Sequence, residues 1–360
     1  MKKIVYIVED KKSAQYRYRV QNVIDALADG ETFSVGVFLK TEVNGVDFRD
    51  IFLVVVLRQT AKDNVVLDFI KRARKKGIKV VFDLDDLIFD YSDLAVLMKS
   101  TNSKNLVYWL GYFWGIRRIA KRVDGFICTN EFLANKLKRS FNKPVKVIRN
   151  SLNKEQVEVS EKWVKKKDDR KKTEKTMGRS EKFRIGYFSG SPTHVKDFRL
   201  VEDDLIRFLE NYDDAILRVV GYMEFSDRMK KMIEGGRVEV IGVVDYLRLQ
   251  GLMSKVDVNI APLVINNFTN CKSELKFFEA AAVETTTIAS PTFAFKNAIT
   301  DGENGLLAKP GEWYDKLKYL YEHPEENQRL AKNAKTYALK HYYGKEFLKE
   351  VEAAYDFFAK

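Results

Sequence analysis

The sequence predicts an α/β protein made of two tandem Rossmann-like, doubly wound domains that face a cleft. Its 360 residues are too many for one ordinary hydrophobic core. Short apolar runs alternate with helical patterns twice along the chain, on either side of a charged segment at 156–182. Unbroken apolar runs are typical of parallel strands that helices cover on both faces. We therefore expect domains at 1–155 and 183–340, with 156–182 between them as a solvated linker or a charged helix, and a C-terminal helix at 341–360 that can pack back on the first domain.

The apolar runs define the expected strands. In the first domain they span 4–8, 34–39, 52–56, 79–82, 125–128 and 145–148. In the second domain they span 184–188, 215–220, 238–241, 257–261 and 287–290. Helical patterns fit the gaps, such as 65–76, which stops at Gly77. The final helix carries Phe347, Val351 and Tyr355 on one apolar stripe.

Charge and composition narrow the range of partners. The net charge is +12, and ten Lys/Arg against five Asp/Glu at 161–182 concentrate much of it in one segment. The chain shows no module with interleaved aromatic and basic residues, so we expect no nucleic-acid partner. Cys128 and Cys271 lie far apart and match no metal-ligand spacing, which favours a reducing compartment. No run reaches the roughly 20 apolar residues of a membrane span. We expect a cytoplasmic protein.

An acidic motif ends the fourth apolar run. The stretch VVFDLDDLIFD places Asp83, Asp85 and Asp86 directly after a buried strand. Such a motif could hold the nucleophile of a haloacid-dehalogenase-like phosphatase, the metal of one class of glycosyltransferases, or an acidic active-site edge or helix caps. The downstream residues that such a phosphatase needs are missing, and that class of metal-binding transferases has a single domain. For Asp85 and Asp86, an active-site role and helix capping remain open.

A small polar turn follows the first strand of the second domain. Gly190 and Ser191 come directly after that strand, with His194 and Lys196 just beyond. A glycine-containing turn lets backbone N–H groups approach phosphate oxygens, and a nearby lysine adds positive charge. The turn lacks the three spaced glycines of a dinucleotide fingerprint. It indicates an anion site without naming the anion.

A second polar cluster follows the fourth strand of this domain. It contains Lys272, Ser273, Glu274 and Leu275, and Glu279 comes more than a turn later. Ser273 has the place of a helix N-cap, so free N–H groups of that helix would face an anion. Glu279 could accept hydrogen bonds from a ribose diol, or it could be an ordinary surface glutamate.

Three stretches of the second domain carry a family resemblance. They are VEVIGVVDYLRLQGLMSKVDVNIAPL at 238–263, FFEA followed by IAS within 277–290, and DGENGLL at 301–307. These stretches resemble the retaining glycosyltransferases of GT-B fold, the group 1 or family 4 class. The resemblance implies transfer of a sugar from a nucleotide-sugar donor, without a metal or other cofactor. It also implies a role in building a bacterial surface glycan.

The resemblance assigns roles in donor binding. In the family, the second glutamate of a Glu-x7-Glu motif holds the donor ribose, and Glu279 falls on it. The first glutamate falls on Cys271, where this sequence departs from the pattern. Lys196 matches the basic residue that contacts the donor diphosphate, and cations with a helix N-terminus can neutralise that group without a metal. The expected donor-binding residues are Gly190, Ser191, Lys196, Tyr246, Lys272, Ser273, Glu274, Leu275 and Glu279.

The first domain resembles the family less closely, as expected for the side that binds a variable acceptor. Arg17 and Arg19 follow its first strand and Arg58 follows its third, so we expect these three residues to bind the acceptor. Ligands of such folds bind at the carboxyl ends of the strands. For catalysis we expect Asp85, Asp86, His194 and Lys196.

The segment 105–122 has two interpretations. Residues 106–116 contain five aromatic residues and no charge, and Arg117, Arg118, Lys121 and Arg122 follow. The helix could contact an anionic membrane that carries a lipid-linked acceptor, or it could lie in the core of the first domain.

Together these patterns predict a glycosyltransferase that moves a sugar from a nucleotide-sugar to a glycan acceptor, free or lipid-linked, in the cytoplasm or at the inner face of the plasma membrane. A GT-B-fold sugar-nucleotide epimerase and a non-catalytic sugar-nucleotide-binding protein are alternatives. A haloacid-dehalogenase-like phosphatase is a more remote alternative.

Overall fold

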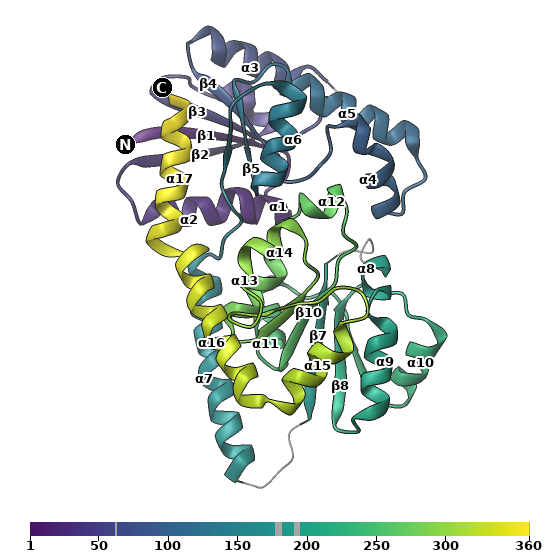
Figure 1. Ribbon diagram of the computed structural model, residues 1–360. Coiled ribbons are helices and arrows are strands. Elements are labelled where there is room, and N and C mark those ends of the chain that lie inside the picture. The colour runs from purple at the N-terminus through teal and green to yellow at the C-terminus, as the bar shows by residue number, and fades with distance from the viewer. Residues whose placement is uncertain (62, 177–181, 191–194, 360) are drawn as a thin grey trace. The chain divides into compact units, whose positions relative to one another are not determined.

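The computed structural model describes residues 1–61, 63–176, 182–190 and 195–359 (Figure 1). The chain forms two compact units. Unit 1 contains Met1–Asn153, Asn270–Ser273 and Lys340–Lys360, and unit 2 contains Lys154–Thr269 and Glu274–Leu339. The C-terminal segment therefore belongs to the same unit as the first 153 residues.

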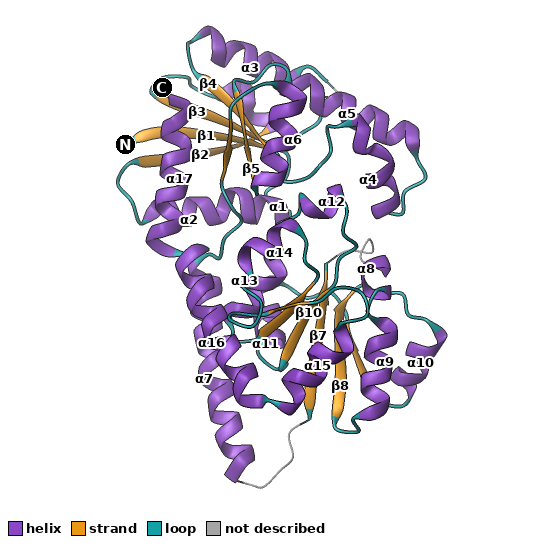
Figure 2. Ribbon diagram, viewed as in Figure 1, coloured by secondary structure: helices purple, strands orange, loops and turns teal. Residues whose placement is uncertain are grey.

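A six-stranded parallel sheet forms the centre of unit 1 (Figure 2). Its strands are β1 (Lys2–Val8), β2 (Phe33–Leu39), β3 (Ile51–Leu57), β4 (Lys79–Asp83), β5 (Gly125–Cys128) and β6 (Val145–Val147), in the spatial order β2-β1-β3-β4-β5-β6. The chain moves outward from β1 to β2 and then back to β3. This reversal makes a topological switch point between β1 and β3, where ligands of open α/β sheets bind.

Helices cover the sheet of unit 1. They are α1 (Ala14–Tyr16), α2 (Asn22–Ala28), α3 (Val65–Lys75), α4 (Leu94–Ser100), α5 (Leu106–Ala120), α6 (Glu131–Phe141) and α17 (Gly344–Ala359), with the short helices η1 (Arg17–Gln21), η2 (Lys40–Gly45) and η3 (Tyr91–Asp93). Asn130 starts α6 by accepting a hydrogen bond from the Leu133 N–H, and Asn142 ends it in the left-handed conformation. The apolar stripe of α17 packs on the strands through Phe347, Val351 and Tyr355.

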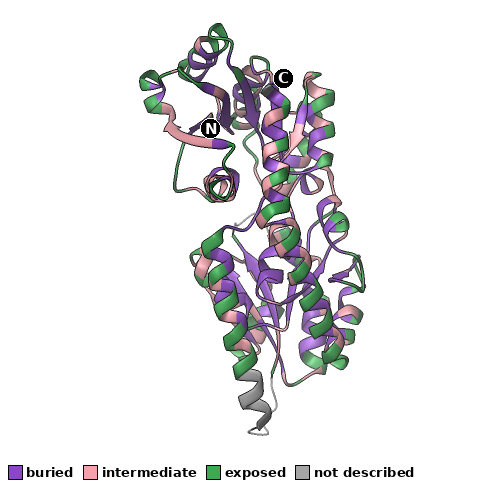
Figure 3. Ribbon diagram, turned by 90° about the vertical axis from the view of Figure 1, so that its left-hand side faces the viewer, coloured by how far each residue is buried: buried purple, intermediate pink, exposed green. Residues whose placement is uncertain are grey.

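Unit 2 contains a second six-stranded parallel sheet. Its strands are β7 (Phe183–Ser189), β8 (Ala215–Gly221), β9 (Val238–Ile241), β10 (Val258–Ala261), β11 (Thr286–Ala289) and β12 (Leu306–Leu307), in the order β12-β11-β10-β7-β8-β9. This is the strand order of dinucleotide-binding Rossmann domains, with the switch point between β7 and β10. In each unit the central strands are buried, the edge strands β2 and β9 are partly exposed, and the helices have an exposed side (Figure 3).

The helices of unit 2 flank its sheet. They are α7 (Lys154–Thr176), α8 (Val195–Arg199), α9 (Glu202–Asn211), α10 (Asp227–Glu234), α11 (Tyr246–Met253), α12 (Asn267–Asn270), α13 (Leu275–Ala282), α14 (Phe293–Ala298), α15 (Trp313–Glu322) and α16 (Pro324–His341). Among the helices of the described ranges, none is long and apolar enough to span a lipid bilayer.

The segment 156–182, expected to be a solvated linker or a charged helix, is mostly helix. Over its first half, α7 packs into unit 2: Val157 and Val164 are buried, and a Cβ atom at Gly251 would lie 2.6 Å from the Trp163 ring. Lys167 donates a hydrogen bond to the Glu284 carbonyl oxygen. The few apolar residues recur at helical spacing, but the many charges around them hide this pattern in the sequence.

Candidate functional site

Two neighbouring strands of unit 1 bring charged side chains together at their carboxyl ends. Leu57 at the end of β3 lies opposite Asp83 at the end of β4, so the residues that follow both strands meet. Nη1 of Arg58 lies 3.2 Å from Oδ1 of Asp85 and 2.9 Å from Oδ2 of Asp86. An expected acceptor-binding residue and two expected catalytic residues therefore form one cluster.

Neither aspartate caps the next helix. Asp90 does so at η3, where its carboxylate accepts a hydrogen bond from the Ser92 N–H. The sequence left an active-site role and helix capping open for Asp85 and Asp86, and the structure does not show capping by either. Gln15 donates to Asp85 at 2.7 Å, a contact that could not be predicted from the sequence.

Lys272 joins this cluster through the short segment Asn270–Ser273, which belongs to unit 1. Its Nζ lies 3.8 Å from Oδ1 of Asp86. The side-chain amide of Asn130 holds the segment by donating to the carbonyl oxygens of Asn270 and Lys272, at 3.2 and 3.1 Å. Lys272 was expected at the donor, and the structure places it beside the expected catalytic carboxylates.

The cluster keeps Asp86 ionised. Burial alone would raise the pKa of the Asp86 carboxyl, but the positive charges of Lys272 and Arg58 outweigh it and hold that pKa below its ordinary value. The same carboxylates hold the pKa of Arg58 well above its ordinary value, against the effect of burial. An ionised carboxylate only accepts hydrogen bonds, and a low pKa makes it a weak base, so it is suited to orienting a hydroxyl group and not to removing its proton.

Arg19 does not lie at the surface where we expected it. It is 1 % exposed, and its guanidinium donates to Asp83 and to the Ile148 carbonyl oxygen. Its N–H groups are thus used for hydrogen bonds inside unit 1, where an acceptor substrate cannot reach them. Asp83, the nucleophile in the phosphatase interpretation, is equally buried. Arg17 is half-buried, with its guanidinium 4.1 Å from the centre of the Tyr18 ring.

In unit 2, the expected ribose-binding glutamate lies on α13. Glu279 is only 5 % exposed, and Gln156 on α7 donates to its Oε1 at 3.3 Å. This burial excludes an ordinary surface glutamate. Tyr246 begins α11 and donates to Glu155 at 2.8 Å. Gln156 escaped the sequence analysis because it lies where a linker was expected, and Glu155 is the last residue before that segment.

The start of α13 differs from the expectation. The helix begins at Leu275 after Glu274, and no side chain caps it. Ser273 lies in unit 1 instead, where its Oγ accepts a hydrogen bond from the Asn150 amide at 2.9 Å. The Ser273 side chain therefore stabilises the segment that carries Lys272 and does not cap α13.

β7 ends at the switch point of unit 2. Gly190 and Lys196 are exposed there, whereas Ser191 and His194 lie outside the described residues. Asp197, next to Lys196 on α8, accepts a hydrogen bond from the Val264 N–H at 2.9 Å. This bond ties α8 to the loop after β10, so the segments that follow the two switch-point strands are held together.

Cys271 stands where the family pattern has its first glutamate. Its thiol is buried, and burial raises its pKa far above the ordinary value, so the group is uncharged at neutral pH. In the described ranges no three His, Cys, Asp or Glu side chains gather in a way that could hold a metal ion.

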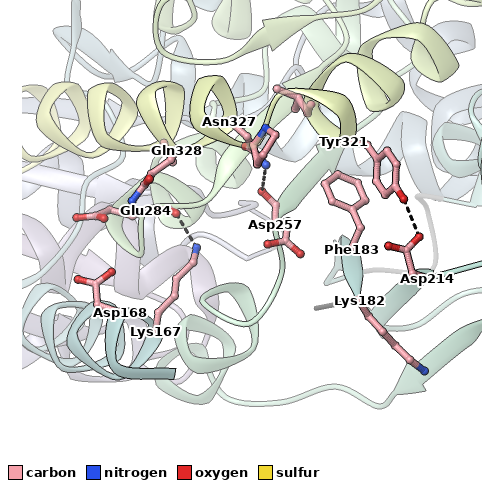
Figure 4. A pocket seen from close by; sticks show the side chains of 13 residues that line it. Lys167, Asp168, Lys182, Phe183, Asp214, Asp257, Glu284, Tyr321, Asn327 and Gln328 are labelled. Carbon is pink, nitrogen blue, oxygen red and sulfur yellow. Dashed lines mark hydrogen bonds between the residues drawn. The ribbon is translucent and has the colours of Figure 1, made fainter. Parts of the chain in front are cut away.

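A cavity of about 370 Å³ lies at the opposite edge of the unit 2 sheet (Figure 4). Lys167, Asp214, Asp257 and Tyr321 are among the residues that line it, and Tyr321 donates to Asp214 at 2.9 Å. Phe183 opens β7 there, so this is the amino-terminal edge of the strands. Because Rossmann-like sheets bind nucleotides at the carboxyl edge, we assign no donor to this cavity.

Unit 2 is similar to a family of glycosyltransferases. Residues 182–323 match the family model described as "Glycosyl transferases group 1". The match covers most of unit 2 and less than half of the whole chain. A comparison with curated proteins finds no match.

Similar solved structures extend over the whole chain. HepE from Anabaena, solved in complex with UDP and glucose, is 15% identical over 100% of both chains with a TM-score of 0.64. Sucrose-phosphate synthase from Thermosynechococcus elongatus is 14% identical over 99% of this chain and 98% of its own, with a TM-score of 0.65. WaaG, a glycosyltransferase involved in lipopolysaccharide biosynthesis, is 12% identical over 99% of both chains with a TM-score of 0.61. At such identities the likeness shows the fold, and it confirms the expected tandem Rossmann-like domains of GT-B architecture.

Proposed function

We propose that the protein transfers a sugar from a nucleotide-sugar donor to a glycan acceptor, with retention of configuration and without a metal. The observation that carries this proposal is the place of Glu279. It is a buried glutamate within the family match, held by Gln156, on the helix that follows the switch-point strand β10. A carboxylate in that place can accept hydrogen bonds from both hydroxyls of a ribose. Solved relatives bind UDP, which supports a nucleotide donor.

In this proposal Lys196 and the N–H groups of the turn at Gly190 meet the donor diphosphate. Their positive charge would stabilise the leaving group as the bond from the sugar C1 to the phosphate oxygen breaks. The acceptor oxygen bonds to C1 on the same face, and its proton passes to the departing phosphate oxygen. The nucleoside diphosphate then leaves, so the protein itself need not supply a base.

Unit 1 would provide the acceptor side. Asp85 and Asp86 can each orient an acceptor hydroxyl, while Arg58 holds both carboxylates in place. We propose that the acceptor is a growing bacterial surface glycan linked to a lipid, and that transfer takes place at the inner face of the plasma membrane. WaaG is described as acting in lipopolysaccharide biosynthesis, which supports a surface glycan.

A protein that binds a nucleotide-sugar without transferring it, or an epimerase, is the second candidate. The observation in its favour is Cys271, an uncharged thiol in place of the family's first glutamate. Nucleoside diphosphate release from a panel of nucleotide-sugars, with and without glycan acceptors, separates the candidates. Acceptor-dependent release with an anomer-retained product supports transfer. A converted sugar without any acceptor indicates an epimerase, and donor binding with neither product would overturn the transferase.

A further inference from the structure

Helix α5 has one apolar face in the core and another in solvent. Phe113, Ile116 and Ile119 are buried against unit 1. On the other side of the helix, Val107 is 81% exposed and Trp114 is 54% exposed. The core interpretation of 105–122 therefore holds for one face of the helix, and membrane contact of the other face stays a prediction.

The exposed face forms one continuous stripe. Positions 107, 110, 111 and 114 are three or four residues apart, so their side chains lie on the same side of the helix. Leu110 is exposed as well, and a Cβ atom at Gly111 would meet no atom of the described residues within 4 Å. Solvent-facing helix surfaces are normally polar, so a contiguous apolar stripe indicates a surface that makes contact with something else.

A basic groove lies beside this stripe, between α3 and α5. It encloses about 640 Å³, and its charged lining residues are Lys71, Arg74, Lys75, Arg118 and Arg122 with a single carboxylate, Asp68. Figure 1 shows α3 and α5 together at one end of unit 1. Five cations against one anion make the groove strongly positive.

Backbone carbonyl and amide oxygens fix two of the arginines without cancelling their charge. Arg118 donates to the Ala61 carbonyl oxygen and to the Asn64 side chain, both at 2.7 Å. Arg122 donates to the Arg118 carbonyl oxygen. Among the residues that the structure describes, only Arg74 of these five cations has a carboxylate partner, Asp124 at 3.1 Å. The guanidinium groups are thus held in position and remain able to attract an anion.

Arg118 connects the stripe to the groove. Its guanidinium lies 4.6 Å from the centre of the Trp114 ring, so an exposed tryptophan and a fixed cation are in contact where the stripe meets the groove. Tryptophan prefers the boundary between water and lipid, because its ring is apolar while its N–H can donate a hydrogen bond. Basic side chains beside an apolar helix face are the pattern of helices that lie in a membrane surface.

We propose that the α5 stripe and the α3–α5 groove dock unit 1 on an anionic lipid bilayer. Val107, Leu110 and Trp114 would enter the headgroup boundary while the groove binds lipid phosphates. The charge of the groove favours this occupant over a second copy of the chain, whose net charge of +12 would repel it. The inference deepens the proposed function by naming the surface that brings a lipid-linked acceptor to the enzyme. The delivery of that acceptor rests on the proposed function, whereas the binding of lipid does not.

Vesicle sedimentation tests the docking surface. The full chain should bind vesicles of phosphatidylcholine with phosphatidylglycerol, and bind vesicles of phosphatidylcholine alone far more weakly. Each basic residue near an anionic surface strengthens binding by about fivefold, so Lys71→Gln with Lys75→Gln should weaken it by about 25-fold. Val107→Ser with Trp114→Ala should weaken binding to the same vesicles.

Matched controls come from exposed residues elsewhere. Lys345 and Lys349 on α17 have the same spacing as Lys71 and Lys75, and Val240 is exposed on β9. Lys345→Gln with Lys349→Gln, and Val240→Ser, should leave vesicle binding unchanged. Circular dichroism confirms that each variant is folded.

Three outcomes would overturn the proposal: no binding to anionic vesicles, equal losses in the controls, or a dimer in sedimentation that Trp114→Ala dissociates. Donor turnover with a soluble acceptor is measured in parallel. Turnover without vesicle binding refutes the docking surface alone, whereas vesicle binding without turnover refutes the transferase alone.

Discussion

Arg19 and Asp83 form an ion pair in the interior of unit 1, with 3.0 Å between Nη2 and Oδ2 and each side chain 1% exposed. Arg19 also donates to the Ile148 carbonyl oxygen at 2.6 Å and to the Asn150 side chain at 3.1 Å. One guanidinium therefore ties η1 to β4 and to the segment after β6. Burial raises the pKa of the Asp83 carboxyl to about 6, although the Arg19 charge opposes this rise.

Replacing Arg19 should destabilise the protein more than a typical substitution does. Arg19→Met leaves Asp83 buried without its cation, and we expect a loss of about 3–5 kcal/mol in the free energy of unfolding. Urea denaturation measures this loss. The double variant Arg19→Met with Asp83→Leu should recover part of it, because no unpaired charge remains. A loss below about 1 kcal/mol in the single variant would show that the pair does not organise this unit.

Arg19 also illustrates which features the sequence could predict. The parallel sheets followed from unbroken apolar runs, and the place of Glu279 on a helix after β10 followed from the family pattern. The burial of Arg19 could not be predicted, because its carboxylate partner lies 64 residues away in the chain. The packing of α7 was hidden for another reason, since its few apolar residues stand in a segment rich in charge, and only tertiary contacts show that Val157 and Val164 are buried.

Glu279→Ala should weaken nucleotide binding. A hydrogen bond to a charged group contributes about 1.5–3 kcal/mol, so we expect the Kd for the nucleoside diphosphate to rise by about 10- to 100-fold. Isothermal titration calorimetry measures this change. Gln156→Leu removes the donor that holds Glu279, so its effect should be in the same direction but smaller. Unchanged nucleotide affinity in Glu279→Ala would refute the assigned donor site.

Lys196→Ala should lower turnover more than it raises KM. The lysine acts on charge that develops on the leaving diphosphate, and removing one such donor typically costs about 100-fold or more in kcat. Arg199 supplies a matched control, because it is an exposed cation on the same helix, α8, and is paired with Glu202. Arg199→Ala should retain wild-type turnover. Equal kcat values for Lys196→Ala and the wild type would remove Lys196 from the mechanism.

Asp86→Asn should reduce turnover, and it should also change how stability depends on pH. The folded pKa of Asp86 is lowered, because Lys272 and Arg58 outweigh the effect of burial. A carboxyl group of this kind stabilises the fold above its unfolded pKa of about 3.9, and this stabilisation is lost as pH falls through the lower folded pKa. The variant should therefore be less stable than the wild type at neutral pH, and the difference should shrink in acid. Urea denaturation at several pH values measures the loss of stability and its dependence on pH, and an assay of nucleoside diphosphate release measures turnover.

Asp85, which also pairs with Arg58, helps to separate the role of Asp86 in turnover from its role in stability. Asp85→Asn leaves the Asp86 contacts with Arg58 and Lys272 in place, so it should remove an acceptor contact at a smaller cost in stability. If Asp85 orients the acceptor, KM for the acceptor rises or kcat falls while donor affinity stays constant. If both Asn variants keep wild-type turnover, the cluster only fixes the loop after β4, and the acceptor must bind elsewhere on unit 1.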